Sequence, residues 1–248
     1  MTIASGERLK GRKIVVTGAA SGMGEAVARL FAAEGAALTL LDITEARLSA
    51  IADELGQHAV AGDISDENGV ERAISGAAER MGGIDGLVNV AGILVRKPVR
   101  ETSFADFQRV LSVNLGGPFL TCRAALPLLE QAEFGTIINV ASLAGLRSQP
   151  GLAAYSATKA GLVAFTEALS GELGPTVRIN AVCPGVIETP MTAYMFEDDS
   201  PHVAVETLNR AARPGTPEEV AKVCLFLSTP ESAFVSSAAI AVTGGHFR

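Results

Sequence analysis

Short runs of apolar residues recur along the chain, and longer stretches with helical spacing of apolar residues separate them. The short runs predict strands over residues 13–16, 37–41, 58–61, 86–90, 136–140, 177–182 and 239–242. The longer stretches predict helices over residues 24–33, 44–55, 66–81, 104–130, 152–173 and 217–227. Several strand runs are apolar at consecutive positions, as expected where helices cover both faces of a sheet. The alternation therefore predicts an α/β, doubly wound fold with a parallel sheet.

No linker, charge block or internal repeat divides the chain, so we expect a single domain over residues 1–248. The longest interruption of the pattern, residues 184–214, is mainly polar but carries an apolar cluster of Met191, Tyr194, Met195 and Phe196. A segment of this kind after a late strand is either a substrate lid, from about residue 186 to 214, or a helix docked on the surface. The sequence leaves both alternatives open.

The overall charge disfavours two classes of partner. A formal net charge of −7 and a pI near 5.1 argue against the basic face that nucleic acids or anionic membranes require. The N-terminus has no apolar core of signal-peptide length, and no segment approaches the length of a membrane span. We therefore expect a soluble, cytoplasmic protein whose partner is a small molecule.

The cysteines and histidines show no metal-binding pattern. The chain has three of each, all widely spaced: Cys122, Cys183, Cys224, His58, His202 and His246. We expect buried, reduced thiols and no catalytic metal.

A candidate proton-transfer group lies in the helix predicted over residues 152–173. Tyr155 and Lys159 are four residues apart, so both side chains lie on one helix face and the ammonium would lower the pKa of the phenol. A phenol whose pKa is lowered in this way can exchange a proton with an alcohol. By itself the spacing is more often a surface or packing feature, and the other motifs of the chain favour the catalytic interpretation.

The first predicted strand runs directly into Gly18, Gly22 and Gly24 and then into a helix. Glycines at this place let the backbone approach a pyrophosphate, whose charge is stabilised by free N–H groups and the helix dipole. Asp42 closes the second strand, where a carboxylate accepts hydrogen bonds from a ribose and repels a phosphate on it. Ile43 and Thr44 offer no compensating cation, so NAD is favoured over NADP, although Arg47 would favour the opposite. The alternative for Asp42 is an ordinary turn or helix cap.

Several motifs occur together in a fixed order along the chain. They are Thr17-Gly18-x-x-x-Gly22-x-Gly24, Asn89-Val90-Ala91-Gly92, Asn114, Ser142, Tyr155-x-x-x-Lys159 and Pro184-Gly185. With this set the whole chain resembles the short-chain dehydrogenase/reductase family. The resemblance implies a seven-stranded Rossmann sheet, hydride transfer between a nicotinamide and a carbonyl or alcohol, and a homotetramer. Small residues on the Tyr155 helix, such as Ala160 and Gly161, would let another helix approach closely, either within the chain or from a second subunit, and the resemblance favours the second.

The resemblance also implies a set of cofactor-binding residues. The glycines would hold the pyrophosphate, Asp42 the adenosine ribose, Asp63 and Ile64 the adenine, and Ile187 and Thr189 the nicotinamide amide. The complete expected set is Gly18, Ser21, Gly22, Met23, Gly24, Asp42, Ile43, Asp63, Ile64, Asn89, Ala91, Gly92, Tyr155, Lys159, Pro184, Gly185, Ile187 and Thr189.

By the same resemblance, four residues would be catalytic. Ser142 would hydrogen-bond the substrate oxygen, Tyr155 would take or give the proton, and Lys159 would bind the nicotinamide ribose and lower the pKa of Tyr155. Asn114 would organise a proton-relay water. An amide in an apolar helical stretch must find partners, so a kinked helix or a bound water is expected there, and a purely structural role is the alternative.

The chain departs from the family pattern at two places. Val90 stands where the family usually has a second Asn, which puts one stabilising hydrogen bond in doubt. Thr243-Gly244-Gly245 stands where Asp-Gly-Gly is common. Neither change touches Ser142, Tyr155 or Lys159.

The expected substrate pocket is mostly apolar, and its residues are Leu94, Leu143, Gln149, Val186, Met191, Tyr194 and Met195. A hydrophobic or cyclic secondary alcohol would gain by burial there. Arg96, Lys97 and Arg100 would instead receive an acidic carrier or a substrate carboxylate, or form an ordinary solvated face.

We therefore expect an NAD-dependent oxidoreductase that acts on a secondary alcohol or ketone. One alternative is a 3-oxoacyl thioester reductase, which Asp42 disfavours and the basic loop favours. A second is a non-catalytic dinucleotide sensor or scaffold, in which Tyr155 or Lys159 would be expected to be replaced.

Overall fold

The computed structural model describes residues 6–196 and 209–245. Seven parallel strands form one sheet in the order β3-β2-β1-β4-β5-β6-β7. The strands are β1 (Lys13–Thr17), β2 (Ala37–Asp42), β3 (His58–Ala61), β4 (Gly86–Asn89), β5 (Gly135–Val140), β6 (Val177–Pro184) and β7 (Ala239–Val242). All seven predicted strands and the doubly wound fold are confirmed.

The helices follow the predicted order with two differences. They are α1 (Gly22–Ala33), α2 (Glu45–Leu55), α3 (Glu67–Met81), α4 (Phe104–Leu111), α5 (Gly117–Leu129), α6 (Leu143–Leu146), α7 (Ala153–Ser170) and α8 (Pro217–Leu227). The helix predicted over residues 104–130 consists of α4, a π-helical turn η2 (Ser112–Gly116) and α5. Helix α6 was not predicted, because four residues are too few to show a helical period. The described residues also form short 3₁₀ turns: η1 (Val99–Glu101), η3 (Ala193–Met195) and η5 (Pro230–Ser232).

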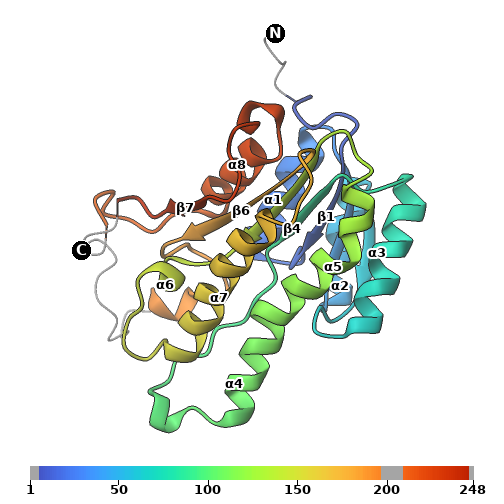
Figure 1. Ribbon diagram of the computed structural model, residues 1–248. Coiled ribbons are helices and arrows are strands. Elements are labelled where there is room, and N and C mark those ends of the chain that lie inside the picture. The colour runs from blue at the N-terminus through green and yellow to red at the C-terminus, as the bar shows by residue number, and fades with distance from the viewer. Residues whose placement is uncertain (1–5, 197–208, 246–248) are drawn as a thin grey trace.

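Apart from the edge strands β3 and β7, the strands are mainly buried on both faces, which explains their consecutive apolar residues (Figure 1). Ile14 and Val16 pack into one core with Val27 and Phe31 of α1. Val15, between them in β1, packs into a second core on the other face, together with helices α3, α5 and α7. Because successive side chains of a strand point to opposite faces, each apolar run supplies both cores.

The strand order reverses between β1 and β4, so the chain winds outward from this point in both directions. In sheets of this type a crevice opens beyond the carboxyl ends of the two strands where the order reverses. The loops that follow β1, β4, β5 and β6 therefore meet at one edge of the sheet.

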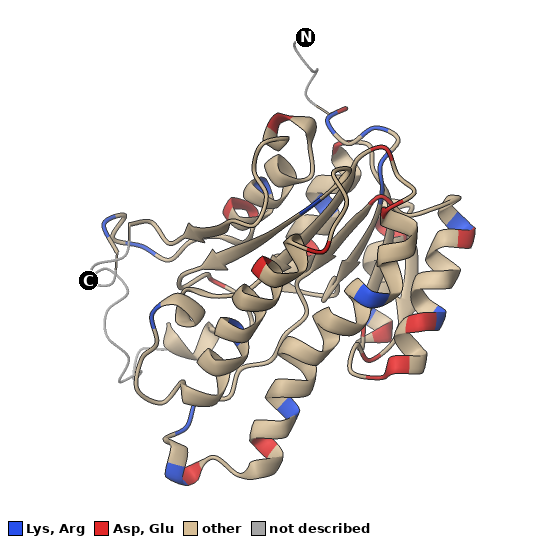
Figure 2. Cartoon of the chain, viewed as in Figure 1, with Lys and Arg blue, Asp and Glu red and all other residues tan. Residues whose placement is uncertain are grey.

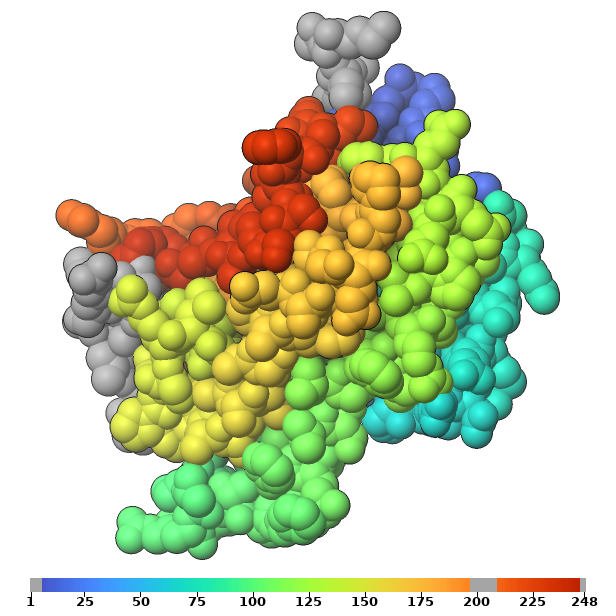
Figure 3. Space-filling view, viewed as in Figure 1, coloured from blue at the N-terminus to red at the C-terminus, as the bar shows by residue number. Residues whose placement is uncertain are grey.

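Charged residues lie mainly on the outer helices and loops, whereas the sheet is largely free of them (Figure 2). The segment around α4 projects from the body of the molecule (Figure 3). Its side chains Val99 and Phe104 are each 71% exposed.

The three cysteines are buried and reduced, as predicted. Within residues 6–196 and 209–245, no helix is long and apolar enough to span a membrane, and no cluster of three or more His, Cys, Asp or Glu could hold a metal ion.

The structure describes both ends of the segment expected to form a lid, residues 186–196 and 209–214. Ile187 and Gly215 form a parallel bridge, so the chain leaves the body and returns to it at neighbouring points. Residues 197–208 lie outside the described residues, and the choice between a lid and a docked surface helix stays open.

Candidate active site

The turn between β1 and α1 is too tightly packed for any side chain at two of its glycines. A Cβ on Gly24 would lie 1.9 Å from the Gly18 carbonyl oxygen, and one on Gly18 would lie 2.7 Å from Ala91 Cα. Gly18 also has φ of +69°, which favours glycine. Ser21, the residue before α1, makes no side-chain hydrogen bond to the first turn, so it leaves the N–H groups there without a cap. The turn thus fits a pyrophosphate held by backbone N–H groups at a helix N-terminus.

A cavity of about 560 Å³ opens next to this turn. It is lined by twelve of the eighteen residues expected to bind the cofactor: Gly18, Ser21, Gly22, Met23, Gly24, Asp42, Ile43, Asp63, Ile64, Ala91, Gly92 and Thr189. It is also lined by residues outside the expected cofactor set: Gly62, Ser65, Val90, Ile93, Arg109, Ser112, Val113, Pro190 and Met191. Met191 was expected in the substrate pocket. Arg109, Ser112 and Val113 come from α4 and η2 and carry no local motif, so only the packing of these elements places them there.

Six of the expected cofactor residues do not line this cavity: Asn89, Tyr155, Lys159, Pro184, Gly185 and Ile187. Asn89 is buried and donates a hydrogen bond to Asn139 Oδ1 at 2.9 Å. Ile187 is 4% exposed and packs in the core. Pro184 and Gly185 line a second cavity instead, described below.

Asp42 lies at the end of β2 with both carboxylate oxygens anchored. Oδ2 accepts a hydrogen bond from the Ala20 N–H at 3.1 Å, and Oδ1 accepts one from the Thr44 N–H at 2.8 Å. A carboxylate oxygen can accept more than one hydrogen bond, so both remain able to bind ribose hydroxyls. Asp42 is therefore held in place at the cavity wall by the backbone.

Arg47, the residue that would favour NADP, is engaged elsewhere. Its Nη2 donates to Glu25 Oε2 at 2.9 Å, and its Nε donates to the Ala20 carbonyl oxygen at 2.5 Å. Arg29 binds the other oxygen of Glu25 at 3.0 Å. Although burial favours the neutral acid, hydrogen bonds from Arg47 and Arg29 lower the pKa of Glu25. The charge of Arg47 is thus compensated by Glu25.

The loop after β4 is held in place without a side-chain amide at position 90. Thr17 Oγ1 accepts hydrogen bonds from the N–H groups of Val90, at 3.1 Å, and Ala91, at 3.2 Å. The Val90 side chain packs against the apolar core. A threonine at the end of β1 therefore holds this loop, and the departure at Val90 leaves it anchored.

Ser142 and Tyr155 face one cavity from different elements. Ser142 lies two residues after the end of β5 and caps α6, where its Oγ accepts a hydrogen bond from the Ala144 N–H at 3.1 Å. Tyr155 lies in the first turns of α7. Both residues line a second cavity of about 170 Å³. Met191 lines this cavity and the larger one, so the two share a wall.

Lys159 is buried below the same helix face. Its Nζ donates to the Val140 carbonyl oxygen at 2.8 Å and lies 5.9 Å from the centroid of the Tyr155 ring. A Cβ on Gly92, a residue of the larger cavity, would lie 3.4 Å from Lys159 Nζ. The ammonium thus lies between the phenol and the wall of the larger cavity. Burial lowers the pKa of Lys159 to about 8, although the nearby Cys183 acts in the opposite direction.

The predicted lowering of the Tyr155 pKa is wrong in its net direction. Burial raises this pKa, and the hydrogen bond with Ser142 opposes the rise only in part. The phenol is removed from water, which disfavours its charged form. The phenol of Tyr155 therefore keeps its proton at neutral pH.

Asn114 lies in the π-helical turn η2 and is fully buried. Its Oδ1 accepts from the Ile93 N–H at 2.8 Å, and its Nδ2 donates to the Ile93 carbonyl oxygen at 2.9 Å. Nδ2 also lies 3.3 Å from Thr158 Oγ1. The expected distortion of the helix is confirmed, and the amide finds its partners in the loop after β4 and in α7. The expected proton-relay water stays a prediction.

A chain of buried polar groups connects the end of β4 with α7. Thr121 donates to Asn89 Oδ1 at 2.8 Å, Asn89 donates to Asn139 Oδ1 at 2.9 Å, and Asn139 donates to Thr166 Oγ1 at 2.9 Å. Thr166 in turn donates to the Leu162 carbonyl oxygen at 2.8 Å. Sequence reasoning missed this chain, because each member is an isolated polar residue in an apolar run. It fixes α7, which carries Tyr155, against β4 and β5.

All seven residues expected in the substrate pocket line the cavity that holds Tyr155: Leu94, Leu143, Gln149, Val186, Met191, Tyr194 and Met195. Phe196 lies outside that lining. The cavity is also lined by Arg96, Arg147, Leu152, Thr192, Asn209 and Thr243. Asn209 is 5% exposed, and its Oδ1 has no hydrogen-bond partner among the residues the structure describes.

The three basic residues Arg96, Lys97 and Arg100 do not act as one cluster, because Lys97 pairs with Asp106 at 3.0 Å and Arg100 lies 3.8 Å from Glu101.

Gly145 sets the distance between α6 and α7. A Cβ at this position would lie 2.7 Å from the Lys159 carbonyl carbon and oxygen. We expect Gly145→Ala to lower the free energy of unfolding by about 1–3 kcal/mol through overpacking. It should also lower turnover, because it pushes Ser142 away from Tyr155. Chemical denaturation and steady-state kinetics measure the two effects.

Gly76→Ala in α3 is the matched control for this substitution. Gly76 has open space around it, with no atom within 4 Å of an added Cβ. The change should leave turnover unaltered and stabilise the helix by up to about 1 kcal/mol. Equal effects of the two substitutions would contradict the role of Gly145.

Comparison with known proteins agrees with this geometry. A family model described as Enoyl-(Acyl carrier protein) reductase matches residues 18–246. A 3-oxoacyl-(acyl-carrier-protein) reductase FabG of Thermotoga maritima is 37% identical over 249 residues, covering 96% of this chain and 98% of that protein. A cyclopentanol dehydrogenase of a Comamonas species is 36% identical over 255 residues, covering 96% of this chain and 98% of that protein.

A solved structure is similar over almost the full length. It is a crystal structure from Brucella melitensis, described as short-chain dehydrogenase/reductase SDR:Glucose/ribitol dehydrogenase. The TM-score is 0.92 and the sequence identity 41%, with 98% of this chain and 99% of that chain covered.

Proposed function

Since the chain belongs to the short-chain dehydrogenase/reductase family, we propose that it transfers hydride between NAD and a secondary alcohol or ketone. Relatives of this chain carry names of enzymes that act on alcohols or 3-oxoacyl groups. A nicotinamide dinucleotide as cofactor follows from the family.

One observation carries the proposal. Ser142 and Tyr155 line the same small cavity, and Met191 forms a wall between it and the larger cavity beside the glycine turn. A substrate oxygen at the two hydroxyls would place its carbon next to a dinucleotide in the larger cavity. Proximity of this kind is the main requirement for hydride transfer.

Each polar residue has a defined task in this mechanism. Ser142 donates a hydrogen bond to the substrate oxygen and orients it. Tyr155 protonates that oxygen when a ketone is reduced and accepts the hydroxyl proton when an alcohol is oxidised. Lys159 has used one of its three N–H donors on Val140, which leaves two for ribose hydroxyls at the wall near Gly92. The bound nicotinamide supplies or accepts the hydride.

The preference for NAD is supported by the charges around β2. Asp42 is anchored at the wall where the adenosine ribose would lie, and its carboxylate would repel a phosphate there. Arg47, which would attract that phosphate, is held by Glu25. Both groups act against NADP.

We expect Asp42→Ser to weaken NAD⁺ binding about tenfold and to strengthen NADP⁺ binding by at least tenfold. Loss of the carboxylate removes two hydrogen-bond acceptors for the ribose and the repulsion of a phosphate. Titration calorimetry of the purified protein with each dinucleotide measures both affinities without turnover.

Asp53→Ser is the matched control, because it removes the same charge from an exposed position in α2 that lines neither cavity. It should leave both affinities unchanged. If Asp42→Ser also left the ratio of the two affinities unchanged, Asp42 would not be the selecting residue.

Reduction of 3-oxoacyl thioesters is a second candidate function. The basic side chains of Arg96 and Lys97 line a cavity of about 790 Å³ next to the substrate cavity, where an acidic carrier would find a complementary charge. The carboxylate of Asp42 disfavours the NADP that such reductases usually take, as the sequence indicated.

Dinucleotide reduction by the purified protein tests the proposal directly. NAD⁺ and NADP⁺ are each supplied with linear, cyclic and aromatic secondary alcohols and with 3-hydroxyacyl thioesters. Turnover with NAD⁺ and one class of alcohol supports the proposed function. Turnover with NADP⁺ and thioesters alone supports the second candidate, and dinucleotide binding without any turnover supports a sensor or scaffold.

A further inference from the structure

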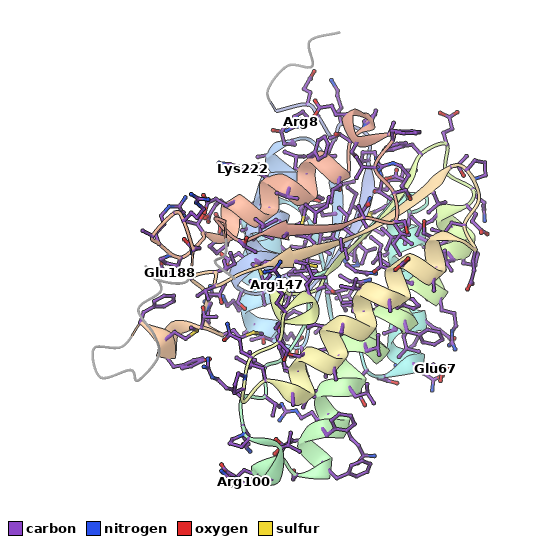
Figure 4. The ribbon with its side chains drawn as sticks, turned by 60° about the vertical axis from the view of Figure 1, so that its left-hand side comes forward. Arg8, Glu67, Arg100, Arg147, Glu188 and Lys222 are labelled. Atoms are coloured by element: carbon purple, nitrogen blue, oxygen red, sulfur yellow. The ribbon has the colours of Figure 1, made fainter. Side chains whose placement is uncertain are left out.

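Two arginines from distant parts of the chain line the cavity that holds Ser142 and Tyr155. Arg96 comes from the loop after β4, and Arg147 follows the last residue of α6, five positions after Ser142. Sequence reasoning grouped Arg96 with Lys97 and Arg100 and overlooked Arg147. The structure instead brings Arg96 and Arg147 to one cavity, and Figure 4 shows Arg147 beside α6, far from Arg100.

This cavity is positive in an acidic protein. The protein has a formal net charge of −7. None of the described residues that line the cavity is an Asp or Glu. The adjoining cavity of about 790 Å³ shares Arg96, adds Lys97, and also has no carboxylate among its described lining residues. Segregation of charge at one site indicates a ligand of opposite charge.

Arg147 has no ionic partner among the described residues, whereas several other arginines have one. Arg12, Arg29, Arg47, Arg123 and Arg213 each lie within 3.0 Å of a carboxylate oxygen. No carboxylate among residues 6–196 and 209–245 forms an ion pair with Arg147, although its backbone N–H is bonded to the Leu143 carbonyl oxygen at 2.7 Å. Arg96 has no such ion pair either, and its Nη1 lies 3.3 Å from the Tyr194 hydroxyl.

The size of the cavity limits the substrate. A volume of about 170 Å³ suits a small molecule. Helix α6 has four residues, about 6 Å of helix, and it separates Ser142 from Arg147. An anionic group at Arg147 would thus be a few carbon atoms away from a carbinol held at Ser142 and Tyr155.

We infer that the substrate is a short hydroxy or oxo acid, whose anionic group binds Arg147, with Arg96 as a second cation at the same cavity. A planar guanidinium binds a carboxylate through two parallel hydrogen bonds and gives the substrate one orientation. This inference rests on the proposed function and names the substrate class of the same site.

The test compares two ligands of similar size and shape, of which only one carries a charge. Titration calorimetry measures binding of pentanoate and of pentanamide to the NAD⁺-saturated protein. We expect pentanoate to bind at least tenfold more tightly, and we expect Arg147→Gln to reduce this ratio to about one. Arg147→Lys should keep part of the preference, because it retains the charge and loses the paired hydrogen bonds. Added salt should weaken binding of pentanoate and leave that of pentanamide unchanged.

Arg100→Gln is the matched control, since it makes the same change at a side chain that is 86% exposed and lines none of the described cavities. The Arg100→Gln protein should keep the wild-type ratio of pentanoate affinity to pentanamide affinity. Equal binding of both ligands to the wild type, or an unchanged ratio in Arg147→Gln, overturns the inference.

Turnover of 4-oxopentanoate and 4-oxopentanamide with NADH separates this inference from the proposed function. Preferred, Arg147-dependent binding of pentanoate without turnover of any ketone or alcohol would support the anion site and contradict the proposed function. Turnover of neutral ketones without any preference for pentanoate would support the function and contradict the anion site.

Discussion

Replacement of Tyr155 by phenylalanine is expected to lower kcat for alcohol oxidation by roughly 10²–10⁴-fold, the usual contribution of a positioned proton-transfer group. The substitution removes the hydroxyl and keeps the ring, so packing in α7 is preserved. The variant should retain its melting temperature and its affinity for NADH. Steady-state kinetics, thermal unfolding and a fluorescence titration with NADH measure the three quantities.

Tyr194→Phe provides a matched control, because the chain has two tyrosines and both line the substrate cavity. Loss of the Tyr194 hydroxyl should change KM by a few-fold and leave kcat almost unaltered. If both variants lost turnover equally, or if Tyr155→Phe kept substantial activity, Tyr155 would not be the proton-transfer group.

The pH dependence of the oxidation and reduction rates follows from the burial of Tyr155. Burial raises the pKa of Tyr155 from the ordinary value of 10.0. Oxidation requires the deprotonated phenol, so its rate should rise with pH between neutrality and pH 10. Reduction requires the neutral phenol as donor, so it should proceed at pH 7 and decline at high pH. Tyr155→Phe should abolish both dependences.

Lys159→Met is expected to lower kcat/KM for oxidation by roughly 10²–10³-fold and to weaken NAD⁺ binding at least tenfold. The side chain of Lys159 places its ammonium between Tyr155 and the wall of the cavity beside the glycine turn. Methionine fills a similar volume without donors, so it loses both the ribose hydrogen bonds and the positive charge near the phenol. Kinetics and calorimetry at pH 7 measure the two losses.

The same substitution should change stability in a pH-dependent way. The pKa of Lys159 is lowered from 10.5 to about 8 by burial, so the folded protein binds fewer protons than the unfolded chain between these values. Stability rises with pH wherever the unfolded state binds more protons. The free energy of unfolding of the wild type, relative to Lys159→Met, should therefore rise from pH 8 to about 10.5. Urea denaturation of both proteins at several pH values measures this difference.

Lys222→Met, at an exposed position of α8, is the control for both effects (Figure 4). It should keep wild-type kinetics and show no rise in relative stability over that pH range. A constant difference between the wild type and Lys159→Met would mean that Lys159 keeps an ordinary pKa in the folded protein.

The positions of the strands along the chain were predictable because their signal is local. A buried parallel strand needs apolar residues on both faces, and residues such as Ile14, Val15 and Val16 show this directly in the sequence. The glycine turn was predictable for a similar reason, because only glycine fits at Gly24. The π-helical turn at Asn114 had only one local sign, a polar residue in an apolar stretch. Its partners in the loop after β4 could not be identified from that sign.

The sequence by itself determined the fold class, the cofactor turn and the residue types at the candidate site, because each rests on short-range spacing. Tertiary structure alone decided the directions in which the pKa values of Tyr155 and Lys159 shift, since burial depends on every element packed around a group. It also decided which cations reach the substrate cavity: Arg147 and Arg96 do, while Arg47 pairs with Glu25 and does not line the cavity beside the glycine turn. Such pairings join residues that are distant in the chain, and no local pattern records them. The homotetramer stays a prediction.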